Sequence, residues 1–228
     1  MCEQNFSKQQ IINQQSSPQI RVYVANLGKY NEGKLVGAWL NLPTTNNKIQ
    51  TFLKEKVELN SQYEEIAIHD YESDFNLNEN ENLYDLNLLA IKLEQITENE
   101  KTLAAAYCNA NGLKDIQSIL NTCEQINEIH YVELEDNTWE NKEEKLGYTI
   151  LEEINSDLKT TLEQCKIGTR LTAYDYFDFE KYGRDISINE GYFATDNIFI
   201  FYTSDIDPKL YTLHELKEQL DDQRTEET

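Results

Sequence analysis

The acidic excess of this chain, and its uneven distribution, constrains the fold more than any other feature. The 228 residues contain 42 Asp and Glu against 20 Lys and Arg, a formal net charge of −22. Residues 1–60 hold 4 acids and 7 bases, whereas the remaining residues hold 38 acids and 13 bases. Charge this far from zero repels itself in a compact state. Solubility requires much less charge, so the acidic part of the chain needs a reason beyond folding.

The same charge limits the classes of partner. No basic stripe is present to neutralise phosphates, which excludes nucleic acid as a simple ligand. Acids recur every two to five residues in two windows: residues 61–100 carry eleven acids and one lysine, and residues 124–163 carry twelve acids and three lysines. The natural partner of such a surface is a basic protein surface. The simpler interpretation, an acidic surface that only keeps the protein in solution, stays open at this point.

The composition is that of a folded protein without a membrane span. Hydrophobic residues make up 39% of the chain, too many for full disorder, and no apolar run approaches the ~18 residues of a span. Residues 1–19 lack the pattern of a secretory signal and are expected to form a flexible Gln/Ser-rich tail. None of the four cysteines lies in a C-x-x-C pair, which indicates free thiols and a cytoplasmic protein.

Residues 20–75 are expected to form a small α+β domain. The segment 20–42 alternates apolar and polar residues on both sides of the turn-like "YNEG", as in a β-hairpin. This hairpin places Trp39 in its core, so we expect Trp39→Ala to unfold the domain. A helix over 48–57 and a short strand over 64–72, with Ile66 and Ile68 on one side, complete a three-stranded antiparallel sheet.

Residues 76–126 are expected to form a helical domain. Apolar residues recur at helical spacing over 83–96 and 113–126. Thr97 and Glu100 have the spacing of a capping box, and Gly112 is suited to end the helix that follows.

Residues 127–204 are expected to return to α+β, followed by an acidic C-terminal extension over 205–228. We expect a strand over 128–134, one helix over 149–162, a short helix over 176–183 ended by Gly183, and strands at 185–188 and 197–202. In the extension, Thr212 and Glu215 form a second capping box.

No catalytic or metal-binding pattern stands out. His69, His130 and His214 lie in no nucleophile motif, and no phosphate-binding glycine loop is present. The segment 70–81, "DYESDFNLNENE", places oxygen side chains at most ligand positions of a calcium loop, but Phe75 occupies the position that needs glycine. We therefore expect neither a metal nor a cofactor.

Carboxylates on a helix surface can imitate a nucleic acid. Residues three or four apart on a helix lie about 5–6 Å apart at Cβ, a spacing comparable with the phosphates of one DNA strand. The sequence therefore favours a protein whose surface imitates the phosphates of duplex DNA. An acidic binding module for another basic DNA-binding protein is the alternative.

Four segments of the chain resemble the ArdA antirestriction family: 22–43, 64–72, 83–96 and 176–186, with a weaker similarity at 143–153. The most specific is "YFDFEKYGRDI", an aromatic-Asp-aromatic-Glu pattern followed by aromatic-Gly-Arg-Asp. Together the segments span roughly residues 20–190 in the family's order. The N-terminal tail and the extension after about residue 204 depart from the family pattern.

The resemblance implies an elongated chain of three domains (α+β, helical, α+β) that forms a homodimer through its C-terminal domain. It implies a mimic of bent B-form DNA that fills the groove of the methyltransferase core of type I restriction–modification enzymes, without catalysis. In this view Tyr176, Phe177, Phe179 and Tyr182 anchor a short helix, and Arg184 pairs with a nearby acid.

Twenty acids are the candidates for phosphate mimicry: Asp70, Glu72, Asp74, Glu79, Glu81, Asp85, Glu94, Glu98, Glu133, Glu135, Asp136, Glu140, Glu143, Glu144, Glu152, Glu153, Asp175, Asp178, Glu180 and Asp185. Because a mimic spreads its binding energy over many charges, we expect a single neutralisation such as Glu94→Gln to have little effect.

Overall fold

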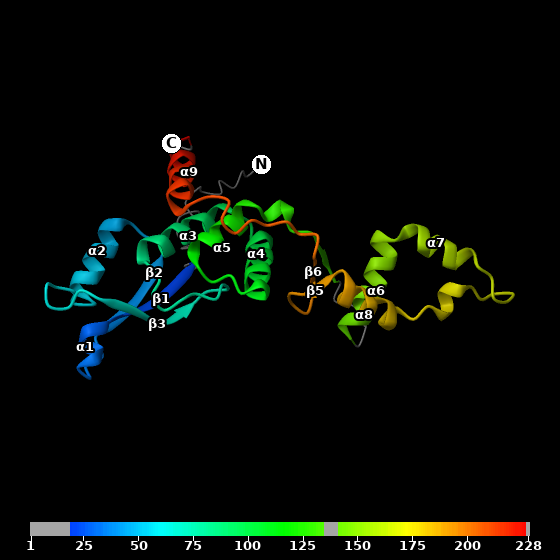
Figure 1. Cartoon of the computed structure of the whole chain (residues 1–228), viewed down its shortest axis with the longest axis horizontal. Coiled ribbons are helices and arrows are strands. Elements are labelled where there is room, and N and C mark those ends of the chain that lie inside the picture. The colour runs from blue at the N-terminus through cyan, green and yellow to red at the C-terminus, as the bar shows by residue number, and fades with distance from the viewer. Residues whose placement is uncertain (1–18, 135–140, 227–228) are drawn as a thin grey trace, which may run out of the picture. The chain divides into compact units, whose positions relative to one another are not determined.

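The computed structural model describes residues 19–134 and 141–226, with side chains through residue 220. These residues form a mixed α+β fold with two three-stranded antiparallel sheets (Figure 1), which confirms the predicted class. They divide into two compact units: unit 1 comprises 19–73 and 82–91, and unit 2 comprises 74–81 and the residues from 92 onward. The three-domain borders and the elongated arrangement stay predictions. Nearly all of the predicted tail, 1–18, lies outside the described residues.

Unit 1 is built on the predicted sheet. Its strands are β1 (Ile20–Asn26), β2 (Gly37–Leu42) and β3 (Ile66–Glu72), in the order β2-β1-β3 and all antiparallel. Ile20, Val22 and Val24 of the central strand are completely buried. The alternation in β1 therefore gives the sheet one apolar face and one polar face.

Two details of this sheet differ from the prediction. The hairpin connection is not a simple turn but begins with a short helix, α1 (Leu27–Asn31), capped by the Asn26 side chain. Where β1 pairs with β3, Tyr23 lies opposite Asp70 and Val24 lies opposite Ile68. His69 of β3 therefore has no partner residue and is the extra residue of a β-bulge.

The expected position of Trp39 in the core is wrong. Trp39 pairs with Tyr23 on the polar face, and 38% of its surface is exposed. The core side of β2 instead carries Leu40 and Leu42. Because large stability losses come from removing buried side chains, we now expect Trp39→Ala to leave unit 1 folded.

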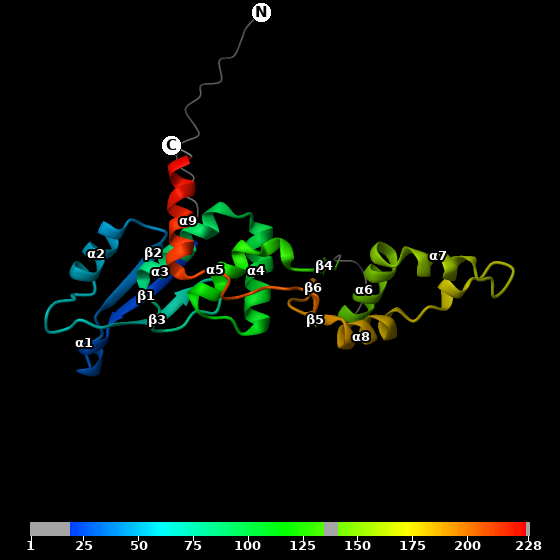
Figure 2. The same cartoon turned by 45° about the horizontal axis from the view of Figure 1, so that its top comes forward.

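Two helices accompany the sheet. The helix α2 (Asn46–Glu55) is capped by Thr45 and lies beside β2 in Figures 1 and 2, with Ile49 buried as predicted. The helix α3 (Leu83–Gln95) begins in unit 1, where Leu86 and Leu89 are completely buried, and ends in unit 2. The helical periodicity of both segments is thereby confirmed.

The first helices of unit 2 also form as predicted. The helix α4 (Glu98–Asn111) starts with the Thr97/Glu100 capping box and ends at Gly112, which has φ +67°. It packs against α5 (Ile116–Glu124), which is followed by the 3₁₀ turn η1 (Ile126–Glu128). At the end of α3, Lys92 forms a 2.8 Å ion pair with Glu124 of α5.

The second sheet has the strand order β4-β6-β5, from β4 (Tyr131–Glu133), β5 (Gly191–Phe193) and β6 (Ile198–Phe201). The strands predicted over 128–134 and 197–202 are confirmed in their central residues. A core cluster of Val132, Leu134, Leu146, Ile150 and Phe199 joins this sheet to the helices beside it.

The predicted single helix over 149–162 is wrong. The chain forms α6 (Lys142–Thr149), a π-helical turn η2 (Ile150–Ile154) and a separate helix α7 (Ser156–Gln164). A π turn adds one residue and so rotates the following side chains by about 100°. Ile150 is buried, whereas Ile154, expected on the same face, is 56% exposed.

Gly183 does not end a helix, and residues 185–188 are not a strand. After the 3₁₀ turn η3 (Ala173–Tyr176) comes the helix α8 (Phe179–Asn189). This helix includes Gly183 as well as residues 185–188. Figures 1 and 2 show α8 packed beside α6. A Cβ on Gly183 would lie 1.8 Å from the Glu143 carbonyl oxygen, and one on Gly147 would lie 2.0 Å from the Phe179 carbonyl oxygen. Glycine here permits backbone contact between two helices.

The C-terminal extension is attached to α5. The buried Asn121 side chain accepts a 2.8 Å hydrogen bond from the Tyr211 amide and donates to the carbonyl oxygens of Tyr211 and Pro208. The helix α9 (Leu213–Glu226) follows, with the predicted Thr212/Glu215 capping box and with Leu216 and Leu220 buried. Residues 207–220 are therefore an ordered part of unit 2.

Candidate partner-binding surface

The predicted acids are on the surface wherever the structure describes them. Glu135, Asp136 and Glu140 lie outside the described residues. The exposed members are Asp70, Glu72, Asp74, Glu79, Glu94, Glu98, Glu133, Glu153, Asp175, Asp178, Glu180 and Asp185, and the half-buried ones are Glu81, Asp85, Glu143, Glu144 and Glu152. None of the described set is enclosed in a core, so all of them can contribute to the field at the surface.

Several of these acids already have a basic partner within the chain. Glu72 pairs with Arg21 at 2.5 Å and Glu98 with Lys101 at 2.6 Å. Asp185 pairs with Lys181 at 2.6 Å, and Glu180 pairs with Arg184, which confirms the predicted role of that arginine. A paired carboxylate presents less charge to a partner than a free one, so the acids differ in what they can contribute.

A second group has no ion pair among the described residues. Apart from Asp175 and Asp178, which accept backbone hydrogen bonds at helix starts, it consists of Asp70, Asp74, Glu79, Glu94, Glu133, Glu143, Glu144 and Glu153, whose side chains are exposed or half-buried. Exposed charges without a fixed cation keep their full field and can attract a basic partner. We call these eight residues the unpaired acids.

The segment 174–185 has a local reason for its alternation of rings and carboxylates. Asp175 accepts a 2.7 Å hydrogen bond from the Thr172 amide, and Asp178 caps α8 by accepting one from the Lys181 amide at 2.9 Å. These acids therefore start the two helices as well as carrying charge.

The aromatic side chains beside them form a connected cluster. The Phe177 ring lies 5.2 Å from both the Phe179 and the Tyr182 rings, and Tyr174 lies 5.7 Å from Phe179. Ring pairs at these distances stabilise one another. The expected anchoring by Phe177, Phe179 and Tyr182 fits this cluster, but that by Tyr176 is wrong, because its side chain is 66% exposed.

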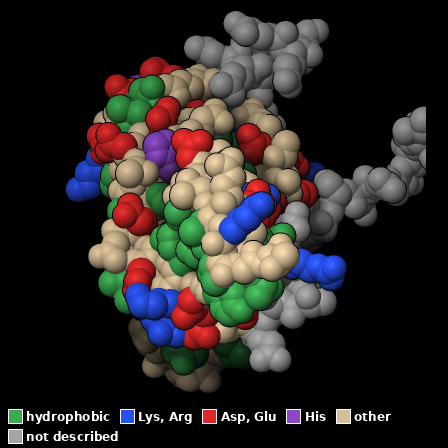
Figure 3. All heavy atoms as spheres, turned by 90° about the vertical axis from the view of Figure 1, so that its right-hand side faces the viewer, with side chains coloured by type: hydrophobic (Ala, Val, Ile, Leu, Met, Phe, Trp, Pro, Cys, Tyr) green, Lys and Arg blue, Asp and Glu red, His purple; other side chains and the backbone are tan. Residues whose placement is uncertain are grey.

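Unit 2 also exposes apolar side chains around α7. Ile154, Ile167, Leu171 and Tyr176 are all large and exposed, and Ile167 and Leu171 face each other in a short hairpin with a 3.0 Å backbone hydrogen bond. In the view from the α7 side, apolar groups are exposed between acidic and basic side chains (Figure 3). This combination is typical of a protein–protein contact surface.

Comparison with known families gives a match over most of the chain. Residues 22–201 match the sequence model of the antirestriction protein (ArdA) family. The chain belongs to the ArdA antirestriction family. Members inhibit restriction–modification, so a restriction–modification enzyme is the target that membership implies. Comparison with curated proteins gives no match.

The ArdA match leaves the C-terminal residues 202–228 outside it, including α9. The bonds from Asn121 and Gln125 of the matched region hold the start of this segment. The segment is therefore an addition to the family core that the core itself positions.

The calcium-loop interpretation does not fit the ArdA chain. Asp70 and Glu72 lie in the strand β3, and the Phe75 side chain is buried, so 70–81 does not turn around a cation. No group of three or more His, Cys, Asp or Glu that could hold a metal occurs among the described residues.

The thiols in the described residues do not form a reactive site. Cys108 and Cys123 are buried and Cys165 is exposed, while Cys2 lies outside the described residues. Burial raises the pKa of the Cys108 thiol to about 12 and raises that of Cys123 further. Both buried cysteines are therefore neutral at physiological pH and act as core residues.

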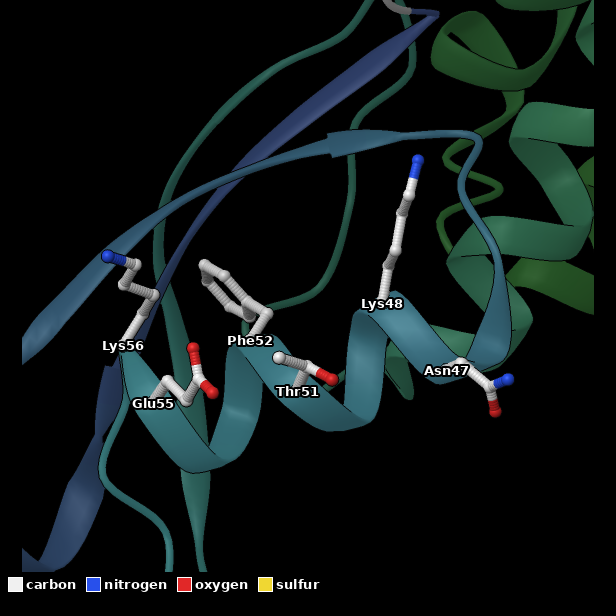
Figure 4. A pocket seen from close by; sticks show the side chains of 6 residues that line it. All are labelled: Asn47, Lys48, Thr51, Phe52, Glu55 and Lys56. Carbon is white, nitrogen blue, oxygen red and sulfur yellow. The ribbon is translucent and has the colours of Figure 1, made fainter.

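A groove of about 340 Å³ follows α2 and is lined by Asn47, Lys48, Thr51, Phe52, Glu55 and Lys56 (Figure 4). Its walls are mainly apolar, and its two lysines give it the opposite charge to the acidic surface. Nothing in the groove suggests participation in the antirestriction contact, and we assign it no ligand.

No helix among the described residues is long and apolar enough to cross a bilayer.

One of the predicted acids, Glu152, has mainly a structural role. It accepts a 2.8 Å hydrogen bond from the Tyr174 hydroxyl and a 2.5 Å bond from Lys159. Burial alone raises the pKa of the Glu152 carboxyl, but the bonds from Lys159 and Tyr174 and the Lys159 charge outweigh it, and the net pKa lies below its ordinary value of 4.5. Glu152 thus ties the π turn to η3 and α7.

This bond network predicts a pH-dependent stability. A lowered folded-state pKa means that the Glu152 contribution is present above the ordinary pKa and is lost as the pH falls through the lowered value. We expect Glu152→Gln to reduce the free energy of unfolding by about 1 kcal/mol at pH 7, and the difference to shrink at pH 3. Urea unfolding measures both. Glu153→Gln, an exposed neighbour, is the control without effect, and an equal loss at both pH values would contradict this role.

Proposed function

We propose that this ArdA chain imitates the charge and shape of duplex DNA and occupies the DNA-binding groove of type I restriction–modification enzymes. The groove belongs to the methyltransferase core, and binding is stoichiometric, without chemistry and without a cofactor. The observation that carries the proposal is the set of unpaired acids in a member of an antirestriction family, of which all but Asp74 and Glu79 lie on helices or strands.

The amount of charge supports the proposal. A net charge of −22 per chain corresponds to the phosphates of roughly 11 base pairs, at two phosphates per pair. A homodimer carries the charge of roughly 22 base pairs. A basic groove that has evolved to neutralise phosphates would gain a similar field from this surface.

Fixed positions for the charges also support it. Asp175 and Asp178 are held by helix caps, and Phe177 and Phe179 fix the backbone between and beside them. A surface that is ordered before binding loses little conformational entropy when it binds. In this proposal the rings set the positions of the charges, which would account for the alternation of rings and carboxylates in 174–185.

We further propose that the chain acts as a homodimer in the cytoplasm, through the predicted C-terminal domain, residues 127–204. The exposed Ile167, Leu171 and Tyr176 are the apolar groups that such a contact would cover. Substituting all three with serine is a direct test by analytical ultracentrifugation, in which the dimer is expected to dissociate and α-helical content to be retained.

The function is tested by a DNA cleavage assay with a purified type I restriction enzyme and its cofactors. A stoichiometric mimic predicts that cleavage stops at a protein concentration that rises in proportion to the enzyme concentration. Substrate that remains intact with time, and protein recovered unchanged, would agree with inhibition without turnover. Full cleavage at a large excess of folded protein would favour the alternative, an acidic module for another basic DNA-binding protein.

A further inference from the structure

The polar face of the unit 1 sheet contains two parallel rows of three side chains. The strand register places Asn41, Arg21 and Glu72 opposite one another in one row. The same register places Trp39, Tyr23 and Asp70 in the next row, two residues along each strand. Because of the bulge at His69, both acids face the same side as the rings and the arginine. Arg21 and Tyr23 are half-buried, and the other four residues are exposed.

The first row is complete without a partner. Arg21 Nε donates to Asn41 Oδ1 at 3.1 Å, and Arg21 Nη1 donates to Glu72 Oε2 at 2.5 Å. The Arg21 guanidinium also lies 5.0 Å from the centre of the Trp39 ring. One guanidinium thus joins a carboxylate on β3 to a polar group and an aromatic ring on β2.

The second row has the same kinds of group but contains no Lys or Arg of its own, and the nearest guanidinium, Arg21 of the first row, lies against its Trp39 ring and pairs with Glu72, not with Asp70. Asp70 is exposed, and its carboxylate accepts a 2.9 Å hydrogen bond from the Tyr71 amide, with no ion pair among the described residues. Tyr23 and Trp39 meet edge to face at 5.7 Å, and 38% of the Trp39 surface is exposed. The central position, which Arg21 fills in the first row, is held here by the neutral Tyr23.

We propose that the Trp39–Tyr23–Asp70 row binds an arginine side chain of the restriction–modification enzyme and anchors unit 1 on it. The inference rests on the proposed function, because it names the chemistry of one contact within that complex. Strands on either side of β1 lie about 10 Å apart, so a guanidinium above Tyr23 can reach the Trp39 ring and the Asp70 carboxylate together. The rings supply a cation–π contact and the carboxylate supplies hydrogen bonds.

The charges of this face favour arginine over a nucleic acid. An exposed Trp can also stack on a base, but the phosphates next to that base would meet Asp70 and Glu72 at the same edge. Lysine can pair with Asp70 but lacks the planar group that Arg21 places against Trp39. A groove that binds phosphates offers arginine side chains at its surface.

The test measures how much protein releases a labelled duplex from a type I methyltransferase. We expect Trp39→Ala and Asp70→Asn each to raise the required concentration about tenfold, the size of a desolvated cation–π or charged contact. Two controls in unit 1 are matched in type: Tyr30→Ala removes an exposed ring and Glu55→Gln an exposed acid outside the row. Both are expected to stay within about twofold of the unchanged protein, and circular dichroism verifies that all four variants fold.

A double variant tests whether the two groups hold one cation. If Trp39 and Asp70 contact the same guanidinium, the double variant Trp39→Ala/Asp70→Asn should need little more protein to release the duplex than the weaker of the two single variants. The second substitution then removes a contact that the first has already lost. If the fold-loss of the double variant equals the product of the two single fold-losses, Trp39 and Asp70 do not contact one shared arginine. If the single variants release the duplex at the same concentration as the unchanged protein, the row does not anchor unit 1, and the proposal of DNA mimicry is unaffected.

The proposed function and this inference fail in different ways. If the unchanged protein releases no duplex, the mimicry proposal fails before any variant is compared. If it releases the duplex and also binds a fluorescent single-stranded oligonucleotide in a Trp39-dependent manner, the row is a base-stacking site and the arginine assignment is wrong. The expected result is release of the duplex and no binding of the oligonucleotide.

Discussion

Replacing Gly183 with alanine is expected to destabilise unit 2 by about 3 kcal/mol, as severe overpacking does. In the interior of a helix, alanine is ordinarily more favourable than glycine by about 1 kcal/mol, so helix propensity predicts the opposite sign. Steric contact decides here, because the added Cβ would lie 1.8 Å from the Glu143 carbonyl oxygen and 2.6 Å from the Gly147 amide nitrogen. Neither backbone atom can move without separating α6 from α8.

Gly168→Ala is the matched control in the same unit. A Cβ at Gly168 would have only the Leu171 Cβ nearby, at 3.9 Å, so its effect is expected within about 0.5 kcal/mol. Urea unfolding followed by circular dichroism measures both variants. A Gly183→Ala protein as stable as the unchanged protein, or more stable, would contradict the close crossing of α6 and α8.

Neutralising a group of unpaired acids is expected to have the largest effect on inhibition. We choose Asp70, Asp74, Glu79, Glu94, Glu133 and Glu153, all exposed, and replace them with Asn or Gln. If Asp70 contributes the tenfold effect proposed above and each of the other five exposed charges contributes about 0.5 kcal/mol, the six together weaken binding about 600-fold. Glu94→Gln alone is expected to change it by only about twofold. Both are measured as the concentration that releases duplex DNA from the methyltransferase.

A control with the same net charge separates position from total charge. Six exposed acids outside the predicted set, Glu55, Glu64, Glu65, Glu128, Asp196 and Asp205, are neutralised in the same way. This variant is expected to keep most of the inhibition. An equal loss in both variants would show that only the total charge matters, and complete loss from Glu94→Gln alone would indicate a discrete hot spot instead of a distributed mimic.

Local signals in the sequence were sufficient to predict much of the fold. The alternation of Ile20, Val22 and Val24 predicts the central strand and its buried face. The capping boxes at Thr97 and Thr212 predict the starts of α4 and α9 to the residue. These features depend on neighbours within four residues, and such contacts can be read directly from the chain.

Features that depend on distant contacts could not be predicted in the same way. Gly183 resembles a helix terminator until Gly147, which lies 36 residues earlier, is known to face it. The π turn at 150–154 interrupts a segment whose spacing is regular for an α-helix. Because of the bulge at His69, Asp70 faces the rings on the polar side of the sheet, and no residue type in β3 predicts a bulge there.

The candidate surface was predictable in part for the same reason. Exposure of the acids follows from their chemistry, and the described ones are indeed exposed or half-buried. Their pairing was not predicted: Glu72 with Arg21 joins two strands 51 residues apart. Trp39 was missed because a tryptophan in a hairpin suggests a core. Its position opposite Tyr23, on the side of Arg21, is the signal that could have placed it on the open face.

The central claim, that this surface takes the place of DNA, is tested most directly by competition at two salt concentrations. A type I methyltransferase is bound to a labelled duplex, and this protein is added at 50 mM and at 200 mM salt. The account predicts release at near-stoichiometric amounts at the lower salt, with the affinity of the protein for the enzyme decreasing as salt rises. A ternary complex in which enzyme, duplex and protein remain together at saturating protein would contradict it.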